Sequence, residues 1–230
     1  MGLSLVVIGV GVTVIGLIII HSIPIIALGV SVVIMGMLAA WGEGSLEESI
    51  LRLSSASWDN LALLLESLGT VSKAIYLPSS MVEDSRPCAL IPQGGAIING
   101  KLPRGFIIRY GSGPSDVGLR VRAIGSKAVE DCLNAGVISN DVGSTLSNCI
   151  VNHLTLAKSV EYSASGDVIS VMVNEPRMNN MYEGTIVNVV LGSPMASIVA
   201  SLVAESLNRP VAIINEESRG NAILINLKVY

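Results

Sequence analysis

No Asp, Glu, Lys or Arg precedes Glu43, and this absence of charge constrains the fold more than any other feature of the chain. Two apolar runs fill the stretch, residues 3–20 and 25–41, and His21-Ser22-Ile23-Pro24 separates them. At about 1.5 Å per residue, helices over these runs are about 27 and 25 Å long, close to the ~30 Å hydrocarbon core of a bilayer. The sequence therefore predicts a two-helix transmembrane hairpin over residues 1–42.

Glycines recur at seven-residue intervals in both runs, Gly9 and Gly16 in the first and Gly29 and Gly36 in the second. Small residues let helix backbones approach closely in lipid. The two helices are therefore predicted to pack on each other or on copies in an oligomer, and the sequence does not choose between these alternatives.

Two spans place both termini on the same side of the membrane. The positive-inside rule says little here, because acids follow the second run and the first basic residue is Arg52. Cys88, Cys132 and Cys149 form a poor disulfide framework, and none of the Asn residues opens an N-x-Ser/Thr glycosylation site. These features predict a cell-membrane protein with both termini in the cytoplasm.

A capping box, Ser45-Leu46-Glu47-Glu48, predicts the start of a helix after the hairpin. An apolar stripe continues to Leu68, and Gly69 is a natural stop. Residues 43–69 are thus predicted to form a juxtamembrane amphipathic helix, which packs on the following domain or on a partner helix.

Residues 70–230 alternate between short apolar segments and helical patterns, and turn residues separate them. Strands are predicted over residues 73–77, 88–91, 106–110, 119–124, 159–163, 167–173, 185–191, 211–215 and 222–229, and helices over residues 126–134, 142–157 and 194–208. The pattern has no strict βαβ regularity. It predicts a soluble α+β domain, with a mixed sheet and about three helices on it.

Gly192, Ser193 and Pro194 precede the last predicted helix. The free amides and the dipole at a helix start can hold an anion, so these three residues are the candidate ligand-binding site. The segment lacks the Lys and the additional glycines of a phosphate loop, and Ser193 as a simple helix cap is the alternative.

Cys149 and His153 lie four residues apart on a predicted helix, so they could bind a metal ion or form a nucleophile–base pair. Both flank an apolar stripe, where cysteine serves as a small core residue and histidine as a hydrogen-bonded filler. We predict no metal site on this pair, and no catalytic residue and no cofactor elsewhere in the chain.

The remaining acids of interest are predicted to lie on solvated surface, because no spacing gathers them on one face. They are Asp116, Glu130, Asp131, Glu175 and Glu183. The net charge of −4, the pI of about 5.2 and the lack of a basic run argue against nucleic acid as a partner.

Four segments look familiar together: residues 73–80, residues 154–160, Gly192-Ser193-Pro194-Met195-Ala196-Ser197 and Asn208-Arg209-Pro210-Val211. With them the chain resembles a family of archaeal predicted membrane proteins of unknown function. The resemblance covers the whole chain, and it implies an archaeal origin and an anchored α+β domain. It implies no activity and no catalytic residues.

The sequence thus predicts a membrane-anchored, non-catalytic cytoplasmic domain for protein interaction or self-association. Its partners would be the lipid bilayer and either a second copy or an unidentified membrane or cytoplasmic protein. The alternative is a membrane-tethered small-ligand-binding protein or enzyme that uses Gly192-Ser193-Pro194. A third reading, in which the hairpin itself shapes or permeates the membrane, finds little support in its apolar helix faces.

Overall fold

The computed structural model describes residues 2–70, 72–94, 100–113, 116–178 and 180–230. Its contacts divide the chain into two compact units, Met1–Asp59 and Asn60–Tyr230. The first unit is helical, and the second contains all the described strands.

Two helices that reverse at His21 and Ser22 form the first unit. Helix α1 (Gly2–Ile15) continues as a π-helix, η1 (Gly16–Ile20), and α2 begins at Ile23. His21 has a left-handed backbone with φ +51°. A Cβ on Gly9 would lie 2.7 Å from the Val33 amide, and one on Gly29 would lie 2.7 Å from the Thr13 amide. The two helices therefore pack closely on each other, and packing on copies in an oligomer stays a prediction.

Helix α2 (Ile23–Ser67) runs without a break from the first unit into the second. The separate helix start predicted at Ser45 is wrong, because extending a helix adds one hydrogen bond per residue fixed, whereas starting a new one is costly. The side chains of the predicted capping box lie outside those that the structure describes. The predicted stop is confirmed: Gly69 has φ +60°, and the Thr70 amide donates to the Leu65 carbonyl at 3.0 Å.

Among the described residues, one helical segment, Ile186–Leu207, has the length and mean hydropathy (2.0) of a membrane span. Within its 18-residue apolar window 78% is buried, as is typical of a core helix. The apolar helices of the hairpin, Ser4–Ile19 and Ile23–Leu38, are shorter. A membrane-spanning hairpin therefore stays a prediction.

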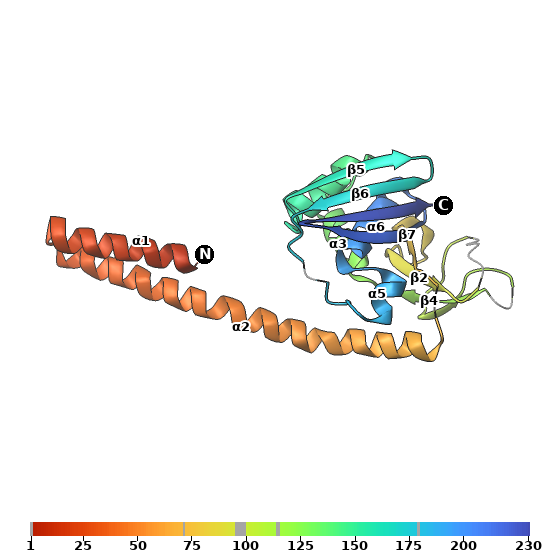
Figure 1. Ribbon diagram of the computed structural model, residues 1–230, viewed down its shortest axis with the longest axis horizontal. Coiled ribbons are helices and arrows are strands. Elements are labelled where there is room, and N and C mark those ends of the chain that lie inside the picture. Colours follow the sequence, from red (N-terminus) through yellow and green to blue (C-terminus); the bar gives the residue numbers. More distant parts are fainter. Residues whose placement is uncertain (1, 71, 95–99, 114–115, 179) are drawn as a thin grey trace. The chain divides into compact units, whose positions relative to one another are not determined.

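An eight-stranded sheet forms the second unit, so the predicted α+β class is confirmed (Figure 1). Its strands are β1 (Ile75–Leu77), β2 (Cys88–Pro92), β3 (Ile107–Arg109), β4 (Val117–Val121), β5 (Ser159–Ser165), β6 (Val168–Asn174), β7 (Val211–Arg219) and β8 (Ala222–Val229). Their order is β3-β4-β2-β1-β7-β8-β6-β5. Every neighbouring pair is antiparallel, so the prediction of a mixed sheet is wrong.

The three predicted helices of this unit are all present, but the one predicted over residues 142–157 ends four residues early and changes into a π-helix, and two short helices were not predicted. The helices are η2 (Ser79–Met81), α3 (Ile124–Asn134), α4 (Val142–Leu146), the π-helix η3 (Ser147–His153), α5 (Ile186–Leu191) and α6 (Pro194–Leu207). Helix α5 replaces the strand predicted over residues 185–191. A short apolar run has the same pattern in a buried helix as in a strand, and β1 already has a neighbour on each side.

Helices α3, α4 and α6 lie on one face of the sheet (Figure 1). Twelve residues of the 14-residue α6 are buried. A second apolar cluster lies on the opposite face, because side chains alternate along a strand. It comprises Ile75, Leu77, Val82, Cys88, Leu90, Leu102, Ile108, Tyr110 and Ala212. The sheet is therefore buried on both sides at β1 and β2, where every residue is buried.

Candidate functional site

Gly192, Ser193 and Pro194 form the junction between α5 and α6. Gly192 has φ +72°, and a Cβ there would lie 2.7 Å from Ile213 Cδ1, so only glycine fits. The Ser193 hydroxyl accepts a hydrogen bond from the Ala196 amide at 3.1 Å, and Pro194 occupies the first turn, where its missing N–H costs nothing. The alternative reading of Ser193 as a helix cap is therefore confirmed.

A carboxylate from the sheet already occupies the start of α6. Glu216 follows a bulge in β7 between Ile213 and Asn215, and its Oε2 accepts a hydrogen bond from the Ser193 amide at 3.2 Å. An acid at a helix start stabilises the positive end of the helix dipole. Any anionic ligand at this point would have to compete with Glu216.

A pocket of about 300 Å³ opens beside this junction. This volume is at the lower end of the range for small-molecule sites. Lys73 enters the pocket from the segment before β1, and its Nζ donates to the Ile214 carbonyl at the bulge. The pocket is lined by Lys73, Asn188, Val189, Val190, Gly192, Ile213, Asn215 and Glu216. A cation, an anion and two amides thus converge on one small cavity.

The pocket amides already have partners within the chain. Asn188 Oδ1 accepts from Asn180 Nδ2 at 3.2 Å, and Asn215 Oδ1 accepts from Asn226 Nδ2 at 2.7 Å. Asn215 Nδ2 also donates to Glu217 at 3.1 Å. Lys73 and Glu216 have partners as well, the Ile214 carbonyl and the Ser193 amide, but an ammonium keeps further donors and a carboxylate keeps further acceptor sites. A ligand would therefore bind chiefly through these two charges, and the amides would position the walls around it.

Near this junction, a buried tyrosine ties β1 to α5. Tyr76 is 1% exposed, and its hydroxyl donates to the Leu191 carbonyl. Burial raises the pKa of Tyr76 well above its ordinary value, and the charge of Glu216 raises it further, although a hydrogen bond with Ser197 acts in the opposite direction. Tyr76 therefore stays protonated at neutral pH and serves as a donor, not as a base.

The predicted pair Cys149 and His153 does not form a site. Cys149 is joined to Cys132 of α3 in a disulfide, with the Cα atoms 5.8 Å apart, and His153 is exposed at the end of η3. Within the described residues, no group of three His, Cys, Asp or Glu side chains is placed to hold a metal ion. The expectation of a poor disulfide framework was wrong, because the fold brings together two residues 17 apart in sequence.

The disulfide also removes one argument for the cytoplasm. Disulfides persist mainly in oxidising compartments, although hyperthermophilic archaea and bacteria keep them inside the cell. The absence of glycosylation acceptor sites is then the remaining sequence cue. The orientation of the termini stays a prediction.

The five acids of interest are scattered, except for Glu130 and Asp131, which share Lys127, and four of the five have partners. Asp116 accepts from the Gly113 amide at 2.7 Å, and Glu175 pairs with Lys158. Lys127 lies 3.8 Å from Glu130 and 2.9 Å from Asp131. Glu183 is exposed. These contacts are surface ion pairs and one hydrogen bond within a loop. They place no two of these carboxylates in a common cleft.

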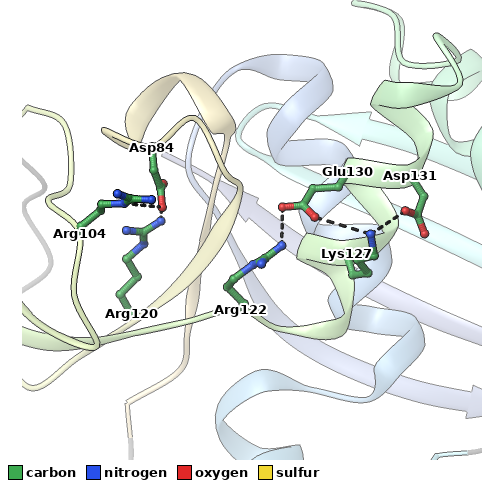
Figure 2. A network of polar contacts seen from close by, with 7 residues as sticks. All are labelled: Asp84, Arg104, Arg120, Arg122, Lys127, Glu130 and Asp131. Carbon is green, nitrogen blue, oxygen red and sulfur yellow. Dashed lines mark hydrogen bonds and ion pairs between the residues drawn. The ribbon is translucent and has the colours of Figure 1, made fainter.

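Figure 2 shows a network of polar contacts that holds two groups of ion pairs. In one group, Arg120 of β4 is 8% exposed; it donates to Asp84 at 2.5 Å and to the Pro103 carbonyl at 3.2 Å. Arg104, which is exposed, lies 3.8 Å from the same carboxylate. The other group joins Arg122 to Glu130 on α3.

Arg120 also contacts Cys88 at the start of β2. Burial raises the pKa of the Cys88 thiol, although a hydrogen bond with Arg120 and its charge lower it in part. The thiol therefore stays protonated at neutral pH. Through Asp84 and the Pro103 carbonyl, Arg120 connects the segments that precede β2 and β3. We therefore assign it a role in stability.

Sequence reasoning missed three of the residues that define these sites: Lys73, Glu216 and Arg120. Arg120 carried a partial signal, since it is one of two arginines within the apolar segment of residues 119–124, and a charge that the fold buries requires a partner. Lys73 and Glu216 carried none, because 142 residues separate them and only the pairing of β1 with β7 brings them to one pocket.

Comparison of the chain with protein-family models, with curated proteins and with solved structures finds no match. The resemblance to archaeal membrane proteins of unknown function therefore stays a prediction, and the sites described above rest on their own geometry.

Proposed function

We propose that the chain is a membrane-anchored domain for protein interaction or self-association, with α1, η1 and the first part of α2 as the anchor. One observation carries the proposal: large apolar side chains cover the outside of the hairpin, and no charged residue precedes Glu43. The exposed ones are Leu5, Val7, Ile8, Val10, Val14, Ile15, Leu17, Ile18, Ile19, Ile23, Leu28, Val30, Ile34, Met35, Met37 and Leu38. Contiguous apolar surface of this extent marks a membrane or protein contact.

The polar groups within the hairpin support a lipid environment. Thr13 and Ser31 donate their hydroxyls to the carbonyls of Gly9 and Ala27, both at 2.8 Å. Such bonds to the carbonyl four residues earlier satisfy a hydroxyl within its own helix. A bilayer accepts helices whose polar groups are satisfied internally.

Charges placed on the outside of the hairpin test the anchor. We expect the full chain to stay in the membrane pellet after alkaline carbonate extraction. The double variant Ile8→Asp/Ile34→Asp should appear largely in the supernatant, since an aspartate near the centre of a span costs about 2.5–3.5 kcal/mol. Leu63→Asp is the matched control: Leu63 is 61% exposed on α2 beyond the hairpin, comparable with Ile8 at 58%.

Release of the unmodified chain by carbonate would contradict the anchor. Retention of the double variant in the pellet would contradict it too, provided that its circular dichroism matches that of the Leu63→Asp chain.

A second candidate function, binding of a small ligand, is supported by the pocket beside Gly192, where Lys73 and Glu216 present opposite charges. Because Lys73 and Glu216 are the charged members of the pocket lining and have opposite signs, a small zwitterionic or polar molecule is the chemistry that they favour.

Native mass spectrometry of the full chain, released gently from membranes, tests this second function. The expected result is a reproducible small-molecule adduct that Lys73→Met abolishes, because the variant keeps the aliphatic stem and removes the ammonium group. Lys158→Met is the control, since Lys158 is also an exposed lysine but pairs with Glu175. Bare protein, or an adduct that survives Lys73→Met, would exclude the pocket as its site.

A further inference from the structure

Strand β5 forms an open edge of the sheet. It pairs over seven residues with β6 on one side and ends the strand order on the other (Figure 1). Six of its seven residues are exposed. The opposite edge strand, β3, has only three residues. Of the two edges, β5 therefore offers the longer row of backbone groups.

The protective features common on edge strands are missing from β5. Natural edges are blunted by proline, lysine, bulges or inward-pointing charges. The seven pairs of β5 with β6 run in unbroken register, and the strand contains no proline and no lysine. Its single charge, Glu161, accepts a hydrogen bond from Asn174 of β6 at 3.3 Å, and Ser159 accepts another at 3.1 Å. Both side chains thus turn toward β6 and leave the edge open.

The inner face of β5 is supported by a helix. A Cβ on Gly143 of α4 would lie 2.6 Å from the Tyr162 ring, so the ring packs directly on that helix backbone. The backbone of β5 is therefore already held in an extended conformation. Pairing with a further strand would cost little conformational entropy on the β5 side.

We propose that β5 pairs antiparallel with β5 of a second copy, across a two-fold axis at Tyr162. The proposal rests on the self-association part of the proposed function and identifies its surface. A two-fold axis perpendicular to the sheet keeps each face of the sheet continuous across the two copies. Side chains that lie opposite each other must then be on the same face, so each residue lies opposite its own copy or opposite a residue an even number of positions away. Centred on Tyr162, all seven residues of both strands pair.

Charge disfavours the register centred on Glu161, and both neighbouring registers shorten the ladder. Shifting the centre to Glu161 would place two carboxylates directly opposite each other, which destabilises a pair, and would also shorten the ladder. With Tyr162 at the centre, Glu161 lies opposite Ser163. At each end, Lys158 lies opposite Gly166, next to Asp167 of the second copy, and both residues are exposed. The strand is thus self-complementary in its aromatic and hydroxyl positions, and Lys158, which pairs with Glu175 in its own copy, also lies near an acid of the second copy.

Membrane anchoring would assist this contact. Two short strands bury little area, but confinement to one surface raises their effective concentration without any additional contact. A second copy is therefore the partner that we propose, because its β5 has the complementary sequence and its hairpin would hold it in the same membrane.

Cysteines at the two ends of β5 test the register. Ser159→Cys and Ser165→Cys replace exposed hydroxyls with thiols of similar size. At position 159 the sulfur can still accept from Asn174 as a weak acceptor, so both variants should keep the fold. The two full-length variants, carrying different tags, are co-expressed, and their membranes are treated with a short thiol–thiol cross-linker. The native cysteines do not compete, since Cys88 is buried and Cys132 and Cys149 form a disulfide.

In the proposed register, residue 159 lies opposite residue 165 of the second copy, whereas identical positions are about 20 Å apart, at ~3.3 Å per residue. We expect a cross-linked dimer from the mixture and none from either variant alone. A dimer from each single variant would indicate parallel pairing and overturn the proposal.

Co-purification of the two tags separates this proposal from the broader one. If the tags co-purify but no cross-link joins residues 159 and 165, self-association stands and β5 pairing is refuted. If the tags do not co-purify, self-association itself fails, and carbonate extraction of the same membranes reports separately on the anchor.

Discussion

Arg120→Ala is expected to lower the free energy of unfolding by about 3–5 kcal/mol, the typical cost of removing one partner of a buried ion pair. The Arg120 side chain is 7% exposed and that of its partner Asp84 is 14% exposed, so the variant leaves a carboxylate largely out of water. It also removes the hydrogen bond to the Pro103 carbonyl. Urea unfolding of the detergent-solubilised chain, followed by tyrosine and tryptophan fluorescence, measures the loss.

Arg104→Ala is the matched control, because Arg104 approaches the same carboxylate from solvent. Its side chain is 75% exposed and lies 3.8 Å from Asp84, and surface ion pairs contribute less than about 1 kcal/mol. Equal losses in the two variants would show that Arg120 acts as a surface charge, contrary to its burial.

The same pair makes the stability of the second unit depend on pH. Burial raises the pKa of Asp84, but the hydrogen bond and the charge of Arg120 outweigh it, and the net pKa is lowered. An acid with a lowered pKa in the folded state stabilises the fold above its unfolded pKa of about 3.9. That stabilisation is lost as the pH falls through the lower folded value. The difference between Arg120→Ala and the unmodified chain should therefore shrink below about pH 4, and a difference independent of pH would contradict the ion pair.

Gly125→Ala should destabilise the domain by about 3 kcal/mol, the upper part of the usual range for overpacking. Helix α3 crosses α6 at this glycine, and an added Cβ would lie 2.7 Å from the Ser197 carbonyl carbon and still closer to the carbonyl oxygen. The Gly125 amide also donates to the Ser197 hydroxyl at 3.3 Å. A methyl group would therefore force the two helices apart. Thermal unfolding measured by circular dichroism reports the change.

Substitution of the next residue in α3, Ser126, by alanine should increase stability. Ser126 is 1% exposed, and within the part of the chain that the structure describes its hydroxyl has no hydrogen-bond partner. A buried unsatisfied hydroxyl costs about 1–3 kcal/mol, so Ser126→Ala should raise the free energy of unfolding by about 1 kcal/mol. If both alanine variants lowered stability equally, the crossing would not be packed as described.

Prediction from sequence succeeded where a signal acts within a few residues. The hairpin turn at His21 and Ser22, the stop at Gly69 and the cap at Ser193 each depend on neighbours along the chain. Eight of the nine predicted strands match strands of the sheet, because β-branched runs and flanking turn residues are themselves local. The exception, residues 185–191, has an apolar run that suits either a strand or a buried helix.

The same reasoning missed the features that long-range contacts decide. It treated Cys132 and Cys149 as unpaired, although α3 and η3 bring their Cα atoms within 5.8 Å. It proposed an anion site at Ser193, where the structure places the chain's own Glu216. Neither partner can be chosen from spacing in the sequence, since each choice depends on how helices and strands pack.

By itself the sequence determined the charge-free hairpin, the α+β class and most element positions, because hydrophobic periodicity and capping chemistry act over one or two helical turns. Only the tertiary structure decided the antiparallel strand order, the disulfide, the Arg120–Asp84 pair and the open edge at β5. These features join residues that are distant along the chain, and their partners are selected by the packing of the whole domain.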